Sequence, residues 1–304
     1  SASLVGSEMC IRDRATSLAI NKDVIAKLPN EVRQIINSDA EVVNKLGSNA
    51  MGNYLYVYKG VYATDEDVPV NPLTGERLRM GGNTSTQAYF KAGDPIWVDV
   101  NGDYIIDEKD KVIVGNSQPR MTGGISINLR YKAFSINTNC SFTLRRHIIN
   151  KALADRFRAY GTPVAGKVNL TGSGALTPIE AYNFWTEDNI YAQYPNPFDY
   201  TRSSIIQPFR YDQTLFMEDG SYFKINGISV AYTIPKKMLD FFRISRCQLN
   251  FSMNNIYTFS KYSGINPENV NNLGYDTSGG YPNGRTVTFG VSMDCLLYTS
   301  DAAD

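Results

Sequence analysis

Five segments of the chain alternate between apolar and polar side chains with a period of two. They lie at residues 122–132, 133–144, 227–235, 247–259 and 285–294. In the first of them, Ile125, Ile127 and Leu129 share one face, and Ser126 and Asn128 share the other. This spacing is typical of β-strands that have one apolar face and one polar face.

Two further segments extend the pattern. LYVYKGVYA, which starts at Leu55, is an earlier strand candidate, and ATSLAI, which starts at Ala15, reads as the end of one more strand. Phe223 and Ile225 have the opposite parity to Ile228, so we expect a β-bulge near Asn226-Gly227. The whole chain therefore predicts an all-β, antiparallel structure with about six or seven long strands.

The connections between these segments alternate in length. Short ones fall at 131–133 and 235–246, and long ones at 64–121, 145–221 and 260–284. A loop as long as 145–221 argues against an ordinary compact sandwich. It contains short helical pieces such as IINKALADRFRAYG. We therefore expect tight turns at one end of the strands and long loops with short helices at the other.

Long strands that are apolar on the outside and polar on the inside are the pattern of a transmembrane β-barrel. In lipid every backbone group must be paired, so the sheet closes and its outer face is apolar. Aromatic residues near the strand ends fit the interfacial girdles of such barrels. The candidates are Tyr131, Phe134, Tyr257, Phe259 and Tyr262. A soluble β-sandwich, whose strands also alternate, is the alternative at this point.

Composition excludes several classes of function. The chain has 30 basic and 30 acidic residues, so it offers no electrostatic footprint for nucleic acid. Its only histidine, His147, follows two arginines and is expected in an exposed loop, which leaves little for a histidine zinc site or a Ser–His triad. Cys140 and Cys247 lie on separate strand-like segments and do not form a disulfide framework. No acid pair or nucleophile stands out, so we do not expect an enzyme.

The two ends of the chain share an unusual relationship. Met9 to Arg14 can be encoded by a DNA word whose reverse complement encodes Cys295 to Ser300. Both ends resemble translated sequencing adapters. We therefore interpret residues 1–14 and 295–304 as adapter sequence and residues 15–294 as the protein proper.

Several motifs resemble those of one family. They are GDPIWVDVNGDYIIDEKDKVIVGNSQPRMTGGISINLRYKAFSI, EDGSYFKINGISVAYTIPKKML, ISRCQLNFSMNNIYTFSKYSGINPE and GYDTSGGYPNGRTVTFGVSM. Together, in this order, they are similar to the SusC-like (SusC/RagA) TonB-dependent outer-membrane transporters. The resemblance implies the C-terminal part of a transmembrane barrel in the cell outer membrane. It also implies that the plug and the TonB-contacting segment lie outside these residues.

The resemblance implies a function and partners as well. The function is import of nutrient oligomers, glycan or peptide, with a SusD-like surface lipoprotein as a lid and TonB as the source of energy. The alternative is a secreted calcium-binding β-rich adhesin or glycan-binding protein.

The stretch DVNGDYIIDEKD, residues 99–110, has the oxygen spacing of a calcium loop. The candidate ligands are Asp99, Asn101, Asp103, Asp107, Asp110 and the carbonyl of Ile105. It is not an EF-hand, because strand-like segments flank it and Tyr104 stands where an EF-hand needs glycine. The ion would be a structural calcium. The alternative is an Asx-rich turn held by bonds from its own side chains to the backbone.

Aromatic residues crowd the segment 182–200. Tyr182, Trp185, Tyr191 and Tyr194 are the candidate substrate contacts, because aromatic faces suit sugar rings and peptide side chains. The alternative, which we favour, is that these rings form the small core of the loop itself.

Overall fold

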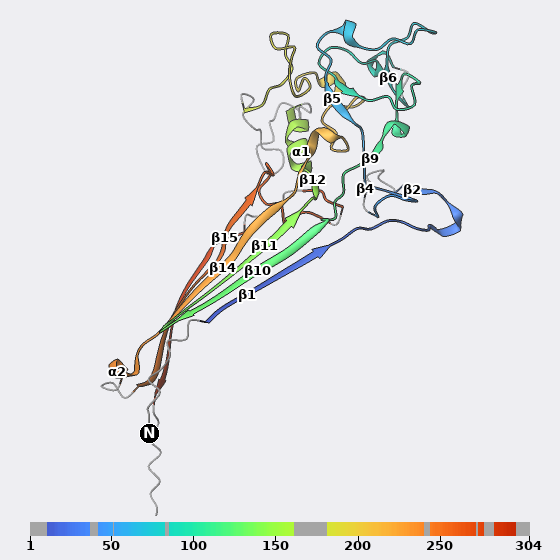
Figure 1. The fold of residues 1–304 in the computed structure, drawn as a ribbon. Coiled ribbons are helices and arrows are strands. Elements are labelled where there is room, and N and C mark those ends of the chain that lie inside the picture. The colour runs from blue at the N-terminus through green and yellow to red at the C-terminus, as the bar shows by residue number, and fades with distance from the viewer. Residues whose placement is uncertain are drawn as a thin grey trace, which may run out of the picture.

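The computed structural model describes residues 11–36, 42–50, 52–82, 85–160, 181–239, 244–271, 273–276 and 283–295. Its main feature is a six-stranded antiparallel sheet with the order β1-β10-β11-β14-β15-β16 (Figure 1). The strands are β1 (Ile11–Ile20), β10 (Met121–Tyr131), β11 (Phe134–Leu144), β14 (Tyr222–Thr233), β15 (Ile244–Ser260) and β16 (Thr286–Cys295). The predicted all-β antiparallel fold is confirmed, and ATSLAI does lie at the end of its first strand.

Connections alternate in length, as the sequence predicts. At one end of the sheet, Lys132 and Ala133 alone join β10 to β11, and a short connection that contains α2 (Lys236–Leu239) joins β14 to β15. At the other end lie the three long loops 21–120, 145–221 and 261–285. Figure 1 shows these long loops gathered beyond one end of the sheet and α2 at the other.

The register of the strands separates an apolar face from a polar face. One cross-strand row joins the apolar residues Leu129, Ile136, Val230, Phe251 and Phe289. The adjacent row joins the polar residues Asn128, Asn137, Ser229, Ser252 and Thr288. Phe251 is 40% exposed and Phe289 is 69% exposed. The apolar rows of the sheet are therefore exposed and are not buried in a core.

A β-bulge lies where the parity of the sequence changes. The register shifts between Ile225 and Gly227 on β14, opposite the pair Asn139/Cys140 on β11. Because of this extra residue, Ile225 and Ile228 fall on the same face, although an odd number of positions separates them. At Gly227 a Cβ atom would lie 2.9 Å from the Asn254 side-chain oxygen, so the close approach of β15 favours glycine there.

The three long loops form one unit, called the loop body below. Its strands are β2 (Gln34–Ile36), β3 (Val42–Lys45), β4 (Gly52–Leu55), β5 (Tyr58–Val61), β6 (Arg79–Met80), β7 (Pro95–Trp97), β8 (Ile105–Ile106), β9 (Val112–Val114), β12 (His147–Ile149) and β13 (Met217–Asp219). Its helices are α1 (Lys151–Tyr160) and the short 3₁₀ turns Pro29–Glu31, Asp65–Asp67, Thr86–Ala88, Glu108–Asp110, Tyr200–Arg202 and Thr214–Phe216. The predicted helical piece in the second loop is therefore confirmed as α1.

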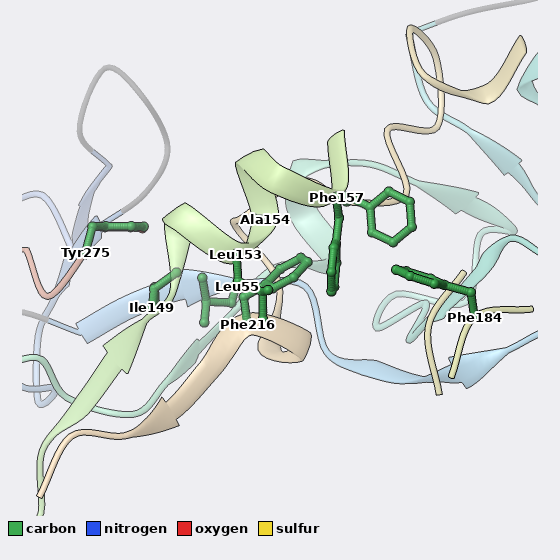
Figure 2. Close-up of a cluster of buried hydrophobic side chains, with 9 residues drawn as sticks. Leu55, Ile149, Leu153, Ala154, Phe157, Phe184, Phe216 and Tyr275 are labelled. Atoms are coloured by element: carbon green, nitrogen blue, oxygen red, sulfur yellow. The ribbon is translucent and has the colours of Figure 1, made fainter. Parts of the chain in front are cut away.

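Two hydrophobic clusters hold the loop body together. The first surrounds Phe157 of α1 and contains Leu55, Ile149, Leu153, Ala154, Phe184, Phe209, Phe216 and Tyr275 (Figure 2). The second contains Tyr56, Tyr62, Val68, Leu78, Phe90, Trp97, Ile106 and Ile206. Both clusters draw residues from more than one loop, so the loops stabilise one another.

The segment from Leu55 contains β-strand, as predicted, but it lies outside the six-stranded sheet. Leu55 ends β4, whose residues are buried, and Tyr58–Val61 form β5 of the loop body. One prediction from the sequence is wrong. His147 is half-buried in β12 instead of exposed, and its Nδ1 accepts the Asn116 backbone N–H at 3.3 Å.

Cys140 and Cys247 are both free thiols, as expected. Within the described ranges, no helix has the length and apolar character to cross a membrane.

Candidate functional site

A buried charged centre joins the first two long loops. The Asp212 carboxylate accepts two hydrogen bonds from Arg210, and its Oδ2 lies 2.9 Å from Nζ of Lys111. The side chain of Lys111 is 1% exposed and that of Asp212 is 10% exposed. Solvent screens such a buried pair little. Each charged side chain is therefore stabilised mainly by its oppositely charged partners, and the loss of one partner would leave a buried charge uncompensated.

Aromatic rings enclose this charged centre. The Arg210 guanidinium lies 4.6 Å from the ring centroid of Tyr56, which stacks on Trp97 at 5.1 Å. The Trp97 indole N–H donates to the side-chain oxygen of Gln213 at 2.8 Å, and Gln213 is fully buried. A cation over an aromatic face is stabilised by the ring quadrupole, so the rings support the charge as well as the packing.

Burial and charge act in opposite directions on the titration of Asp212. Burial alone would raise its pKa, but the hydrogen bonds and positive charges of Arg210 and Lys111 outweigh burial and hold the pKa of this carboxyl below its usual value. For Arg210, burial lowers the pKa, and the Asp212 partner outweighs burial, so that the pKa of the guanidinium is raised. Asp212 and Arg210 therefore both favour their ionised forms.

A second ion pair ties the same two loops together. Arg202 contacts the Asp94 carboxylate through two guanidinium nitrogens and donates to the backbone oxygens of Gln87 and Tyr89. Asp94 and Arg202 are both almost fully buried. The third loop joins through the backbone, because Ile149 exchanges hydrogen bonds with Gly274 and Asp276 at 2.9 Å each. All three loops are thus fixed to one another.

The acidic stretch 99–110 folds as a series of side-chain-to-backbone hydrogen bonds. The Asp99 carboxylate accepts the N–H groups of Gly102 at 2.7 Å and Tyr104 at 2.8 Å. Asp110 accepts from Val100 at 2.9 Å and Asp107 at 2.8 Å, and it is fully buried. Tyr104, at the position where an EF-hand has glycine, takes a left-handed backbone with φ of 62°.

The other predicted ligands have local backbone partners too. Asn101 accepts the Asp103 N–H at 3.0 Å, Asp103 accepts the Ile105 N–H at 2.8 Å, and Asp107 accepts the Lys109 N–H at 2.8 Å. This is the geometry of the Asx-rich turn. In the part of the chain that the structure describes, no group of three or more His, Cys, Asp or Glu residues is arranged to hold a metal ion. Calcium binding here stays a prediction.

The aromatic candidates for substrate contact fall into two groups. Tyr182 and Tyr194 pack edge-on against Phe157, with centroid distances of 4.8 and 5.1 Å. Trp185 is also buried, and its indole N–H donates to the Ala63 backbone oxygen at 3.3 Å. Tyr191, in contrast, is 84% exposed. Three of these rings therefore contribute to the core of the loop body, and Tyr191 offers a ring to the surroundings.

Sequence reasoning missed the charged centre of Lys111, Arg210 and Asp212. Lys111 belongs to the first long loop and the other two residues to the second, and no local pattern links the two loops. The one signal in the sequence is the close succession of Arg210 and Asp212, which becomes informative only once Lys111 is placed beside them.

Known proteins share sequence and fold with this chain. No protein-family profile matches the chain. The TonB-dependent receptor P3 of Formosa agariphila is 27% identical over 303 residues, a match that covers 92% of this chain and 26% of that protein. The TonB-dependent receptor SusC of Bacteroides thetaiotaomicron is 23% identical, over 82% of this chain and 24% of that protein.

Solved structures show the same fold. The RagAB peptide transporter superposes with a TM-score of 0.67 at 17% identity, covering 95% of this chain and 28% of that one. The chain thus has the fold of part of that transporter. Its resemblance to the SusC-like TonB-dependent receptors, expected from the sequence motifs, is confirmed. The chain spans about a quarter of the length of the relatives it matches.

Proposed function

We infer that this chain forms part of the barrel wall and extracellular loops of a TonB-dependent outer-membrane transporter. The observation that carries the proposal is the two-faced sheet, whose apolar rows stay exposed. A soluble adhesin, the alternative considered above, would cover these rows with a second layer, because apolar surface exposed to water is costly.

The spacing of aromatic residues on the apolar face supports this proposal. Near the turn end, Tyr131, Phe134 and Tyr232 form one cross-strand row. Near the loop end, Phe142, Phe223 and Phe259 form another. The two rows lie eight residues apart on β11, or about 26 Å along the strand at about 3.3 Å per residue. With a strand tilt of about 40°, the separation of the two rows along the barrel axis is about 20 Å. This is close to the height of the apolar band of outer-membrane barrels, which is about 25 Å.

The loop body lies beyond the end of the sheet opposite α2 (Figure 1), and in outer-membrane barrels the longer loops are the extracellular ones. In this proposal the polar rows line the lumen and the loop body faces the medium. The transported molecules are nutrient oligomers, glycan or peptide. A SusD-like surface lipoprotein acts as the lid, and TonB supplies energy from the inner membrane. The relatives include TonB-dependent receptors and a peptide transporter, which supports this class of function.

Site-directed labelling of the complete protein in cells tests the proposal. Leu73→Cys places a thiol at a 93% exposed position of the loop body, and Met238→Cys places one at a 65% exposed position of the turn end. A membrane-impermeant maleimide should label Leu73→Cys on intact cells and Met238→Cys only after the envelope is broken. The unsubstituted protein is the control for Cys140 and Cys247.

Labelling of both variants on intact cells would contradict the proposed orientation in the membrane. Recovery of the protein in the medium would favour the secreted alternative.

A further inference from the structure

A small hollow lies between α1 and the third loop. Its volume is about 70 Å³, and its walls include Asn150, Arg156, Tyr182, Ser263 and Asp276. Asn150 follows β12 and Ser263 follows β15, so the hollow lies close to the loop end of the sheet. Three segments that are far apart in the sequence therefore meet around it.

Arg156 is the exception among the charged residues of α1. Lys151 and Arg158 both pair with Asp155, at 3.1 and 3.7 Å. The half-buried Arg156 forms no hydrogen bond or ion pair with any residue that the structure describes. A guanidinium carries five N–H donors, and Arg156 is one of the residues that line the hollow.

The other polar groups of the walls are already engaged. Asn150 and Ser263 donate to the same Glu218 carboxylate oxygen at 2.9 and 2.7 Å. Asp276 is 3% exposed, and its carboxylate accepts the Tyr262 hydroxyl at 2.6 Å. These bonds fix the walls, and neither acid forms an ion pair with Arg156.

Tyr182 supplies a second donor. Its ring is held edge-on against Phe157, and it also contacts Phe184 at a centroid distance of 6.0 Å. Within the described ranges, its hydroxyl has no hydrogen-bond partner. A fixed phenol and an uncommitted guanidinium thus line the same small space.

We propose that this hollow is a carboxylate-binding subsite, in which Arg156 and Tyr182 hold an acidic group of the transported oligomer. The inference rests on the proposed function and narrows its substrate to carboxylate-bearing oligomers. The planar guanidinium matches a carboxylate through two parallel hydrogen bonds, and the Tyr182 hydroxyl can donate a third. The volume accommodates one such group, whereas the rest of the oligomer remains outside.

Binding to the purified complete protein tests the inference. The probes are trigalacturonate and its methyl ester, and a tripeptide with a free C-terminal carboxylate and its amide. We expect one acid to bind at least about tenfold more tightly than its neutral counterpart, because charge-assisted hydrogen bonds are lost in the latter. The pair that discriminates identifies the source of the carboxylate, sugar or peptide.

Arg156→Gln should abolish this preference for the acid. Tyr182→Phe, which keeps the ring in its packed position, should reduce it several-fold. Arg158→Gln is the matched control, since Arg158 lies on the same helix and is paired with Asp155; its preference should equal that of the unsubstituted protein.

Two results would overturn the inference. One is that each acid binds no more tightly than its neutral form, or that no probe binds measurably at millimolar concentration. The other is an acid preference that Arg156→Gln leaves unchanged. Either result, together with labelling that supports the membrane orientation, rejects the subsite and leaves the transporter proposal standing.

Discussion

Nζ of Lys111 lies 2.9 Å from Oδ2 of Asp212, although the two residues belong to different long loops. The pair is part of the charged centre that fixes the first loop to the second. Its position, buried under Tyr56 and Trp97, makes the loop body depend on a charge balance as well as on apolar contacts.

Asp212→Asn should destabilise the loop body by about 3 kcal/mol or more, because Lys111 and Arg210 would lose the Asp212 carboxylate while buried. Glu108, which is 66% exposed and 3.9 Å from Nζ of Lys111, would remain as a weaker counter-charge. The measurement is the urea dependence of protease resistance of the loops in the complete, detergent-solubilised protein. Lys91→Met is the control. Its partner Asp199 is held at a more open site, where Lys91 is 45% exposed, so the loss should stay below about 1 kcal/mol. Equal losses for the two variants would contradict this account of the charged centre.

The stability of the loop body should also depend on pH through Asp212. In the folded protein burial alone would raise the pKa of Asp212, but the hydrogen bonds and positive charges of Arg210 and Lys111 outweigh burial and lower this pKa. The contribution of this group is therefore fully present above about pH 4, the usual value for an unfolded aspartate. It is lost as pH falls further, through the folded value. The same protease assay between pH 3 and 7 should show this loss in the unsubstituted protein and a weaker one in Asp212→Asn.

A positive charge on the apolar face should prevent stable insertion. Ile228→Arg places it midway between the two aromatic rows, where it should cost about 2–4 kcal/mol in a lipid-facing position. Ser229→Arg, one residue further on, places the same charge on the polar face and should be tolerated. Outer-membrane levels and heat-modifiable migration of the complete protein measure the difference. Similar levels for both variants would contradict the assignment of the two faces.

Calcium binding by residues 99–110 is open to calorimetry. The oxygen spacing predicts binding to the complete protein, and Asp103→Ala should reduce the heat of titration. Identical heats of calcium titration with and without the substitution would contradict calcium binding by these residues. Asp110→Ala should destabilise the loop in either case, by about 2 kcal/mol or more, because the N–H groups of Val100 and Asp107 lose their acceptor.

The interpretation of residues 1–14 as adapter sequence stays a prediction, and the register of β1 provides a test. Arg12 pairs with Leu129 and Arg14 with Ile127, so two cations fall in rows that are otherwise mainly apolar. Leu18 and Ile20, further along the same strand, follow the apolar pattern. We predict that the chromosomal gene encodes apolar residues at positions 12 and 14. Amplification and sequencing across the locus decides this, and arginine codons there would reject the interpretation.

The long strands could be predicted from the sequence because their information is local. Period-two alternation in 121–131 and 134–144 sets the two faces, and the parity change near Gly227 marks the bulge. The loop body could not be predicted in this way. Leu55 lies in a run that reads as a strand by composition, but the buried cluster that it joins includes Phe157 and Tyr275 from the other two loops. The spacing of Asp99 to Asp110 fits both a metal loop and an Asx turn, since both need oxygen atoms at short intervals.

The interlocking of the three loops has a consequence for how such proteins diversify. Exchanging one loop for that of a relative would leave buried residues of the other loops without their partners. Asp212 would lose Lys111, for example, or Asp94 would lose Arg202. New properties of the loops would then arise most readily by exchange of the entire loop body, or by substitution of its exposed residues, because the buried contacts between the loops would be inherited together.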